Sequence, residues 1–385
     1  MLTPVNSLRN VNTDKPLLRW GIIGCADIAR KNWKGIWNSG HGRVAAVASR
    51  DLRRSRRFIR ECQGDAPFRP APRALGSYEE LLAAPDVDAV YIPLPTGLRA
   101  QWVKRAADAG KHIVCEKPCA VGVSELTGML DSCLRNHVQF IDGVMFMHSR
   151  RLTKMRRLLD DGRTVGRLKR ITSAFSFRAP DEFFGSNIRA RSELEPYGCL
   201  GDLGWYCIRF ALWAVNWQLP QRVTGRVLSE FRHPLSPSSV PTEFSAELFF
   251  EDGVTSSFYC SFLTETEQWA NVSGTRGYLR LPDFVLPFSG AQTAFETGNP
   301  VFKVRGCDFE MQPHVRRWRV KEHSHGDPTA QESLLFRHFG EQVQTGTVNS
   351  LWPDIALRTQ RVMETCRESA RLGGRPVEVE CQSEM

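Results

Sequence analysis

The chain has 385 residues, of which 42% are hydrophobic and 10% aromatic, and its formal net charge is +9. That length exceeds the usual size of one compact domain and supplies enough apolar side chains for two cores. No apolar run approaches the ~20 residues that cross a bilayer, and residues 1–16 have the polar, irregular composition of a loose tail rather than of a secretory signal. We therefore expect a soluble, two-domain protein without a membrane partner.

Eleven cysteines are scattered along the chain, several of them inside apolar segments. An odd number at irregular spacing does not suit a disulfide framework, so we expect a reducing, cytoplasmic setting. Cys115 and Cys119 are four residues apart, but neither a second pair nor a histidine cluster completes a zinc site. No metal is expected.

Residues 17–145 alternate short apolar runs with amphipathic stretches, the pattern of parallel strands joined by crossover helices. Right-handed crossovers make this an α/β domain with an open, doubly wound parallel sheet of the Rossmann type. The expected strands are Leu18–Gly24, Val44–Ser49, Ala89–Pro93, His112–Cys115 and Val138–Ile141. The expected helices are Ile28–Ser39, Leu52–Cys62, Tyr78–Ala83, Ala100–Ala109 and Val123–Asn136.

Residues 146–385 have a different pattern, in which longer strands follow one another as in a β-meander. They predict an α+β domain on a large, open, mostly antiparallel sheet, whose apolar open face would be buried against a partner. Asp252-Gly253 is a strong hairpin signal between two of the strands. The expected strands are Leu168–Phe177, Val223–Phe231, Phe244–Phe250 and Val254–Phe262, and the expected helices are Arg151–Asp160, Gly201–Val215, Thr329–Gln344 and Ser350–Leu372.

The first strand-to-helix turn can hold a pyrophosphate through backbone N–H groups and the helix dipole. Against the pattern GxGxxG only Gly24 matches, because alanines replace the second and third glycines, and a plain strand-to-helix turn is an equally good interpretation of these residues alone. The position at the start of the first βαβ unit favours nucleotide binding. The expected contacts in this turn are Gly24, Cys25, Ala26, Asp27 and Ile28.

The second strand is followed by Ser49 and Arg50, with Asp51 one residue further on. A hydroxyl and a guanidinium suit the 2′-phosphate of NADP, and Arg54 belongs to the same basic cluster. Asp51 leaves NAD possible. The cluster has no interleaved aromatic residues and no DNA-binding module, so a small cofactor is a more economical partner than nucleic acid.

Two further segments end strands at the carboxyl edge of the sheet, where open α/β sheets bind ligands. The expected cofactor contacts there are Pro93, Leu94, Pro95, Thr96, Glu116, Lys117 and Pro118. Lys117 precedes a proline, which favours extended backbone, although an isolated Lys-Pro is more often a surface turn. Asp202 and Tyr206 are four residues apart and would share one face of a helix. An N-cap and a core aromatic are the alternative interpretation of that pair.

These motifs resemble the Gfo/Idh/MocA family of oxidoreductases, and the likeness runs through most of the chain. Its most specific part is Glu116-Lys117-Pro118. Many members have histidine where Tyr206 stands, and tyrosine there is similar to the subgroup of dimeric dihydrodiol dehydrogenase, NADP-dependent D-xylose 1-dehydrogenase and glucose-fructose oxidoreductase. The resemblance implies that Lys117 and Tyr206 are the catalytic pair, with Asp202 in support, and that the protein is a homodimer. Arg99 departs from the family, since relatives often have histidine there.

Oxidation of an alcohol requires removal of the hydroxyl proton while hydride leaves the carbon. A free tyrosine has a pKa of about 10, and an ammonium within roughly 4–6 Å favours the phenolate and lowers that pKa. We expect Lys117 to do this for Tyr206, which would donate the proton in the reducing direction. Asp202 would either orient Lys117 or accept a substrate hydroxyl.

The substrate wall is expected to mix aromatic and polar groups, which suits a sugar, a polyol or a cyclic diol. The nominated residues are Phe146, His148, Phe177, Arg178, Asn187, Arg189 and Arg191. The leading hypothesis is an NADP-dependent dehydrogenase or reductase. Two alternatives stay open: an NAD-dependent glycoside-cleaving enzyme that retains its cofactor, and a non-catalytic sensor of NADP(H).

Overall fold

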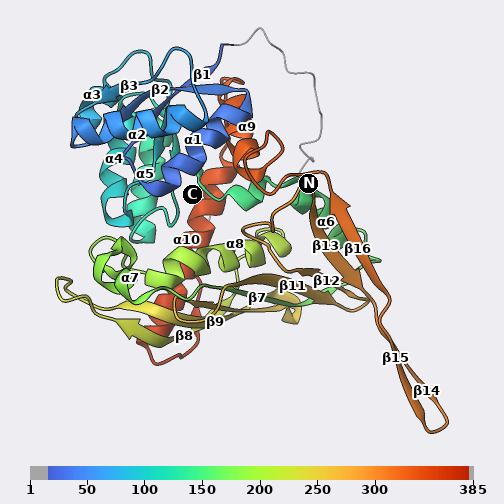
Figure 1. Ribbon diagram of the computed structural model, residues 1–385. Helices are drawn as coiled ribbons and strands as arrows, with labels where there is room; N and C mark the ends of the chain where they lie inside the picture. The colour runs from blue at the N-terminus through green and yellow to red at the C-terminus, as the bar shows by residue number, and fades with distance from the viewer. Residues whose placement is uncertain (1–15, 381–385) are drawn as a thin grey trace.

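The computed structural model describes residues 16–380 and contains two sheets that carry helices (Figure 1). The predicted tail falls mainly on residues 1–15, which lie outside the described residues. Within residues 16–380, no helix is long and apolar enough to cross a membrane.

The first sheet has six parallel strands in the order β3-β2-β1-β4-β5-β6, with helices on both faces. The order reverses between β1 and β4, which is the switch point where such sheets bind ligands. The doubly wound prediction is confirmed. The strands are β1 Leu18–Ile23, β2 Gly42–Ala48, β3 Arg73–Leu75, β4 Ala89–Ile92, β5 His112–Cys115 and β6 Phe140–Asp142. The helices are α1 Asp27–Ser39, α2 Leu52–Asp65, α3 Tyr78–Leu82, α4 Thr96–Asp108 and α5 Val123–Arg135.

Helix α1 illustrates how the sequence specifies these elements. Its buried residues include Ala29, Trp33 and Ile36, which recur at the spacing of one helical face. Trp33 packs edge-on against Phe68, with ring centroids 5.2 Å apart. The helix ends where Gly40 adopts a left-handed φ of 71°, a conformation that glycine tolerates without strain.

The second sheet has nine strands in the order β16-β13-β12-β11-β7-β10-β9-β8-β17. Only β7 and β10 pair in parallel, so the predicted mostly antiparallel sheet is confirmed. The strands are β7 Leu168–Ser176, β8 Arg222–Phe231, β9 Val240–Phe249, β10 Thr255–Ser261, β11 Glu267–Gly274, β12 Tyr278–Leu281, β13 Thr293–Gly298, β16 Val315–Val320 and β17 Val377–Glu378. The helices of this part of the chain are α6 Arg150–Asp160, α7 Asp181–Ser186, α8 Trp205–Ala214, α9 Gln331–Val343 and α10 Leu351–Arg371.

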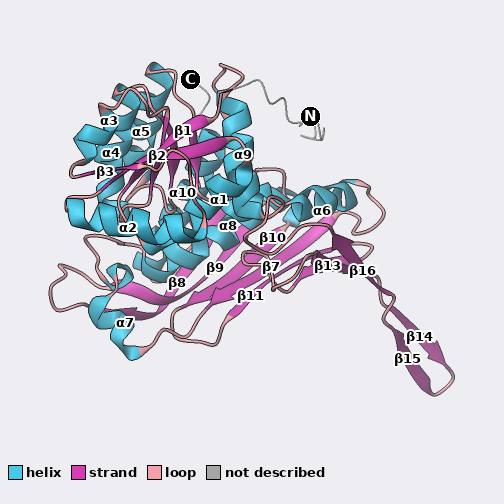
Figure 2. Cartoon of the chain, turned by 45° about the horizontal axis from the view of Figure 1, so that its top comes forward, coloured by secondary structure: helices cyan, strands magenta, loops and turns pink. Residues whose placement is uncertain are grey.

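The predicted turn at Asp252-Gly253 is confirmed, because β9 and β10 pair antiparallel on either side of it. Asp252 itself has a φ of 58°. Strands β14 Val301–Arg305 and β15 Asp308–Gln312 form a separate two-stranded hairpin that extends away from the rest of the molecule (Figure 2).

Two features tie the sheets together. Helix α9 returns from the second sheet to pack on α1, and Phe336 and Phe339 each lie 5.2 Å from the ring of Trp20 in β1. The Arg209 guanidinium of α8 donates hydrogen bonds to both carboxylate oxygens of Asp142 in β6, at 3.2 and 2.5 Å. The expected domain boundary between residues 145 and 146 lies between the two sheets in the sequence. Helix α9 comes after this boundary but packs on α1 of the first domain.

Candidate active site

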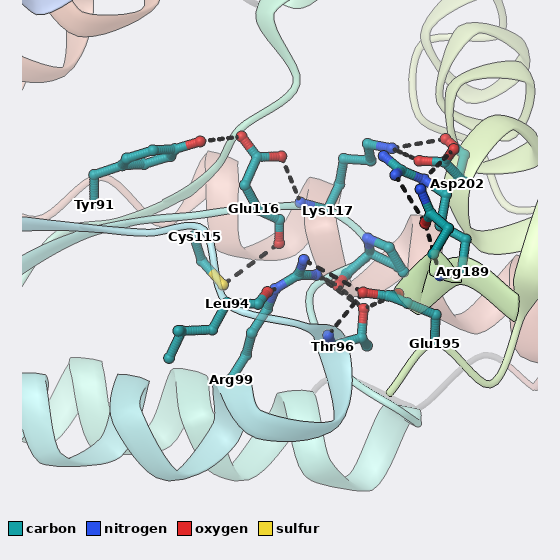
Figure 3. Close-up of polar contacts among 12 residues, drawn as sticks. Tyr91, Leu94, Thr96, Arg99, Cys115, Glu116, Lys117, Arg189, Glu195 and Asp202 are labelled. Atoms are coloured by element: carbon teal, nitrogen blue, oxygen red, sulfur yellow. Dashed lines mark hydrogen bonds and ion pairs between the residues drawn. The ribbon is translucent and has the colours of Figure 1, made fainter. Parts of the chain in front are cut away.

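Lys117, Asp202 and Tyr206 lie together where β5 ends against the start of α8. Figure 3 shows the contact between Lys117 and Asp202. The Lys117 ammonium donates to the Asp202 carboxylate and to the Asp202 carbonyl oxygen, both at 2.7 Å. The same nitrogen lies 4.7 Å from the centroid of the Tyr206 ring. Asp202 and Tyr206 follow Lys117 in the sequence by 85 and 89 residues, and the fold brings the three side chains into one cluster.

The Asp202 carboxylate also accepts a hydrogen bond from a second cation, the Arg189 guanidinium. Its other carboxylate oxygen receives a hydrogen bond from Arg189 Nε at 2.7 Å, and Asn187 accepts from the backbone N–H of Arg189 at 3.0 Å. Asp202 lies in a π-helical turn, Leu200–Gly204, and such turns are frequent at functional sites. The two cations lower the pKa of the Asp202 carboxyl despite its burial, so this residue is ionised at neutral pH. The N-cap alternative does not apply.

Tyr206 is buried among aromatic rings, with Phe175 at 5.6 Å and Phe146 at 6.1 Å between centroids. Burial raises its pKa well above the usual value, and the negative charges of Glu116 and Asp202 raise it further. The expected net lowering of this pKa is not seen, because the phenol is desolvated and the neighbouring ammonium is paired with Asp202. Tyr206 is therefore protonated at neutral pH.

Glu116 supports the segment that carries Lys117. Its carboxylate accepts from the Tyr91 hydroxyl at 2.6 Å and from the amide of Asn32 at 3.4 Å. Its second oxygen accepts from the backbone N–H of Lys117 at 3.3 Å. Neither Tyr91 nor Asn32 was predicted, because both reach Glu116 only through the stacking of α1, β4 and β5.

Arg99 explains how the chain accommodates its departure from the family pattern. The guanidinium is buried and donates to the Leu94 carbonyl oxygen at 2.7 Å, to Thr96 Oγ1 at 3.0 Å and to the Pro118 carbonyl oxygen. Glu195 lies 4.0 Å from it and accepts from both the backbone and the hydroxyl of Thr96. This cluster fixes the two loops that flank Lys117 (Figure 3). Sequence offered no signal for Glu195, which is 99 residues from Thr96.

The turn before α1 fits a dinucleotide phosphate. Gly24 has a φ of 103°, and a Cβ there would meet Leu94 at 2.9 Å, so this position requires glycine. Helix α1 begins after Ala26 without any side-chain cap, and the N–H groups of Asp27 and Ile28 at its start are placed to bind an anion. Arg54 reaches the same turn and donates to the Cys25 carbonyl oxygen at 3.2 Å.

The residues nominated for the substrate wall separate into two groups. Phe146 lies beside Tyr206, Arg189 contacts Asp202, and Asn187 contacts Arg189. Phe177 packs against aromatic rings 5.2 and 5.9 Å away, Arg178 is exposed, and Arg191 pairs with Glu193. None of these last three has a described contact with the cluster.

His148 is 4% exposed and stacks on Trp352 at 4.7 Å. Its Nδ1 lies 3.1 Å from Nδ1 of His338 in α9. A side chain enclosed by α9 and α10 offers no surface to a substrate, so this position gives no support to the predicted role of His148. Burial lowers the pKa of His148 well below its usual value and lowers that of His338 to about 4.

This histidine pair predicts a pH dependence of stability. The lowered pKa of His338 means that the unfolded chain binds more protons than the folded chain between pH 6.5 and about 4. Stability is therefore highest above that window and falls as the pH drops through it, by up to about 1.4 kcal/mol per pH unit for each proton. We expect H338Q to flatten this decline in urea denaturation series at several pH values. H325Q, which changes an exposed histidine, should keep the wild-type decline, and an unchanged slope in H338Q would contradict the assignment.

Two family models match the chain. The model described as oxidoreductase family, NAD-binding Rossmann fold, matches residues 18–144, and the GFO/IDH/MocA C-terminal domain matches residues 152–280. Together they span more than half of the chain. The protein belongs to the GFO/IDH/MocA oxidoreductase family, which confirms the resemblance inferred from the motifs.

Named relatives cover most of the chain. The D-xylose 1-dehydrogenase (NADP(+)) 2 of Haloferax volcanii is 29% identical over 92% of this chain and 98% of its own length. The trans-1,2-dihydrobenzene-1,2-diol dehydrogenase of Bos taurus is 30% identical over 69% of this chain and 74% of its own. A 3-ketoreductase from Actinomadura kijaniata, crystallised with NADP and TDP-benzene, shares the fold with a TM-score of 0.74 at 24% identity over 92% of this chain and 98% of that one.

Proposed function

We propose that this protein is an NADP-dependent oxidoreductase that transfers hydride between NADP and a hydroxyl or carbonyl group of a sugar, a polyol or a cyclic diol. The observation that carries the proposal is the Lys117 ammonium held by Asp202 at 2.7 Å over the ring of Tyr206. The family supports the reaction class, and relatives named for D-xylose, for a dihydrobenzenediol and for a keto sugar nucleotide support the substrate class.

Tyr206 is the proposed general acid and base. Its raised pKa keeps the phenol protonated at neutral pH, so the resting site is ready to give a proton to a carbonyl oxygen. After proton transfer, the ammonium of Lys117 beside the ring stabilises the phenolate that remains. Reduction of a carbonyl uses this protonated form, whereas oxidation of an alcohol starts from the phenolate.

Asp202 is proposed to hold Lys117 in place. Its ionised carboxylate lies between Lys117 and Arg189, and this pairing restricts the lysine to one position beside Tyr206. Arg189 and Asn187 are then the polar groups on the open side of the cluster, where they would bind substrate hydroxyls or an anionic substituent.

The residues of the first sheet support NADP over NAD. When bound, NADP supplies or accepts the hydride, and the turn from Gly24 to Ile28 would hold its pyrophosphate. Arg50 is exposed at the end of β2, available to a 2′-phosphate. The Asp51 carboxylate accepts from the backbone N–H of Arg53 at 2.9 Å, so it caps α2 instead of facing a ribose.

Arg50 provides a test of cofactor choice. We expect Arg50→Ala to weaken NADPH binding by about 10- to 100-fold, the effect of one charge-assisted hydrogen bond, with NADH binding unchanged. Nicotinamide fluorescence titration measures both. Arg60→Ala, which removes an exposed arginine further along α2, should leave both affinities unchanged. Equal losses for the two cofactors would argue against a 2′-phosphate contact.

The activity itself is tested by following nicotinamide absorbance with NADPH and a panel of aldoses, keto sugars and cyclic diols. Turnover with at least one member supports the proposal. A cofactor that survives purification and shows no net absorbance change during cleavage of a glycoside would favour the retained-NAD alternative. NADPH binding without turnover across the whole panel would favour the sensor. The cytoplasmic setting and the homodimer stay predictions.

A further inference from the structure

A cavity outside the candidate active site lies where α1 of the first domain meets two loops of the second. Its volume is about 710 Å³, which is within the range of small-molecule pockets. Helix α1 supplies one side, and residues 286–289, after β12, and 324–326, before α9, supply much of the rest. The lining includes neither the Lys117 cluster nor the turn from Gly24 to Ile28. A ligand here would therefore be bound separately from NADP and from the substrate.

The packing of α9 on α1 brings a cation and a carboxylate to this cavity. The two helices lie side by side (Figure 1). They approach closely at Gly35, where a Cβ would meet the Glu332 carbonyl oxygen at 3.3 Å. Lys31 precedes Gly35 by one turn and shares its face of the helix. Lys31 and Glu332 both line the cavity, so the two domains contribute opposite charges to one space.

Both side chains have hydrogen-bonding capacity that the protein does not use. Glu332 is 2% exposed, and its Oε1 accepts from the backbone N–H of Gly326 at 3.0 Å. Its Oε2 is buried and has no donor among residues 16–380. A buried polar atom without a partner is costly, so such atoms in native proteins require an explanation. Lys31 is half-buried, and its ammonium has no ion pair or hydrogen bond within the same residues.

The other two cations of α1 that line the cavity are already paired. Lys34 donates to both carboxylate oxygens of Asp65, at 3.0 and 3.3 Å. Arg30 lies 2.7 Å from the carboxylate of Glu61. Lys31 is thus the α1 cation left for an external anion, and Glu332 Oε2 is the acceptor left for an external donor.

We propose that this cavity binds a small molecule that carries an anionic group together with hydroxyl groups, the chemistry of a hydroxy acid or of a polyol phosphate. The anionic group pairs with the Lys31 ammonium, and a hydroxyl donates to Glu332 Oε2. A simple anion would leave Glu332 without its donor, and a neutral polyol would leave Lys31 without its counter-charge. Because Lys31 and Glu332 belong to different domains, the bound molecule joins them.

Isothermal titration calorimetry on the full chain with NADPH tests this ligand class. The probes are D-gluconate and D-glucitol 6-phosphate, and neither has an aldehyde or ketone that NADPH could reduce. We expect at least one to bind with a Kd of about 1 mM or below, the range that ligand efficiency allows for so small a molecule. D-glucitol and inorganic phosphate, which each lack one of the two groups, should bind at least about 10-fold more weakly. Absence of binding by both probes would overturn the proposal.

Two variants locate the bound probe. Lys31→Ala removes the cation, and Glu332→Gln replaces Oε2 by an amide that donates instead of accepting. Each should weaken binding of the probe by about 10-fold or more, the effect of losing a hydrogen bond to a charged group. Lys104→Ala, which removes an exposed lysine of α4, should bind like wild type. NADPH titration confirms that each variant is folded. Binding that survives in Lys31→Ala but is lost in Arg189→Ala would place the probe in the candidate active site and contradict the proposal.

Hydrogen exchange locates the probe without any substitution. We expect saturation with the probe to slow amide exchange in residues 286–289 and 324–326, including the Gly326 N–H that Glu332 accepts. Protection confined to the segments around Lys117 and Asp202 would contradict the assignment. Because calorimetry and hydrogen exchange are read without turnover, a failed activity assay leaves these tests intact.

Discussion

Tyr206→Phe is expected to lower kcat by about 10²- to 10⁴-fold, the usual contribution of a positioned acid or base. The phenylalanine keeps the packing against Phe146 and Phe175 and removes only the hydroxyl. Binding of NADPH should be unchanged, because no part of the phosphate-binding turn is altered. Steady-state kinetics with the best substrate of the panel, together with fluorescence titration of NADPH, separate the two effects.

Tyr259→Phe provides a matched control. Tyr259 lies in β10 and donates its hydroxyl to Glu243 in the neighbouring strand, away from the Lys117 cluster. This variant should retain wild-type kcat. If Tyr206→Phe also retained full activity, the proposed acid would be wrong, and the sensor hypothesis would gain support.

Arg209→Met is expected to destabilise the protein by about 3–5 kcal/mol, because removing one member of a buried ion pair leaves the other charge without a partner. Arg209 and Asp142 have 0% exposed side chains, and Arg209 also donates to Thr359 in α10 at 2.7 Å. The substitution therefore removes contacts that join α8, β6 and α10. Urea denaturation followed by tryptophan fluorescence measures the change in the free energy of unfolding.

The control for this prediction is an exposed ion pair. Arg57 lies 2.8 Å from Glu61 one turn away in α2, with 73% of its side chain exposed. Arg57→Ala should change stability by no more than about 0.5 kcal/mol. Adding Asp142→Asn to Arg209→Met should recover part of the loss, since the stranded charge is then gone. A loss below about 1 kcal/mol in Arg209→Met would show that solvent reaches Asp142.

Much of the first domain could be predicted from the sequence because its strands are buried on both faces and appear as continuous apolar runs. Strand β5 has the bounds expected from the sequence, and α1 and α5 differ from expectation by one residue at one end. Strand β3 was missed because its three residues include no fully buried side chain. Strands β11 to β16 were not predicted individually, since polar residues are interspersed along each of them and dilute the apolar signal.

Some features of the candidate site could be predicted from the sequence, and others could not. Lys117, Asp202 and Tyr206 could be nominated because each belongs to a local motif. The charge state of Tyr206 could not, because its pKa depends on burial and on how close Glu116 lies to it, and the motifs show neither. Arg99 was identified only as a departure from the family pattern. Its partner Glu195 comes from a segment with no distinctive sequence pattern. Long-range electrostatic partners of this kind require the tertiary structure.

The return of α9 to β1 has a consequence for dissecting the molecule. A fragment that stopped after β6 would lack Phe336 and Phe339, and the indole of Trp20, 1% exposed in the intact chain, would then face water. The nucleotide-binding half is thus completed by residues near the C-terminus, and neither half is expected to fold or be expressed well in isolation. Proteolysis and thermal melting should accordingly report one cooperative transition instead of two.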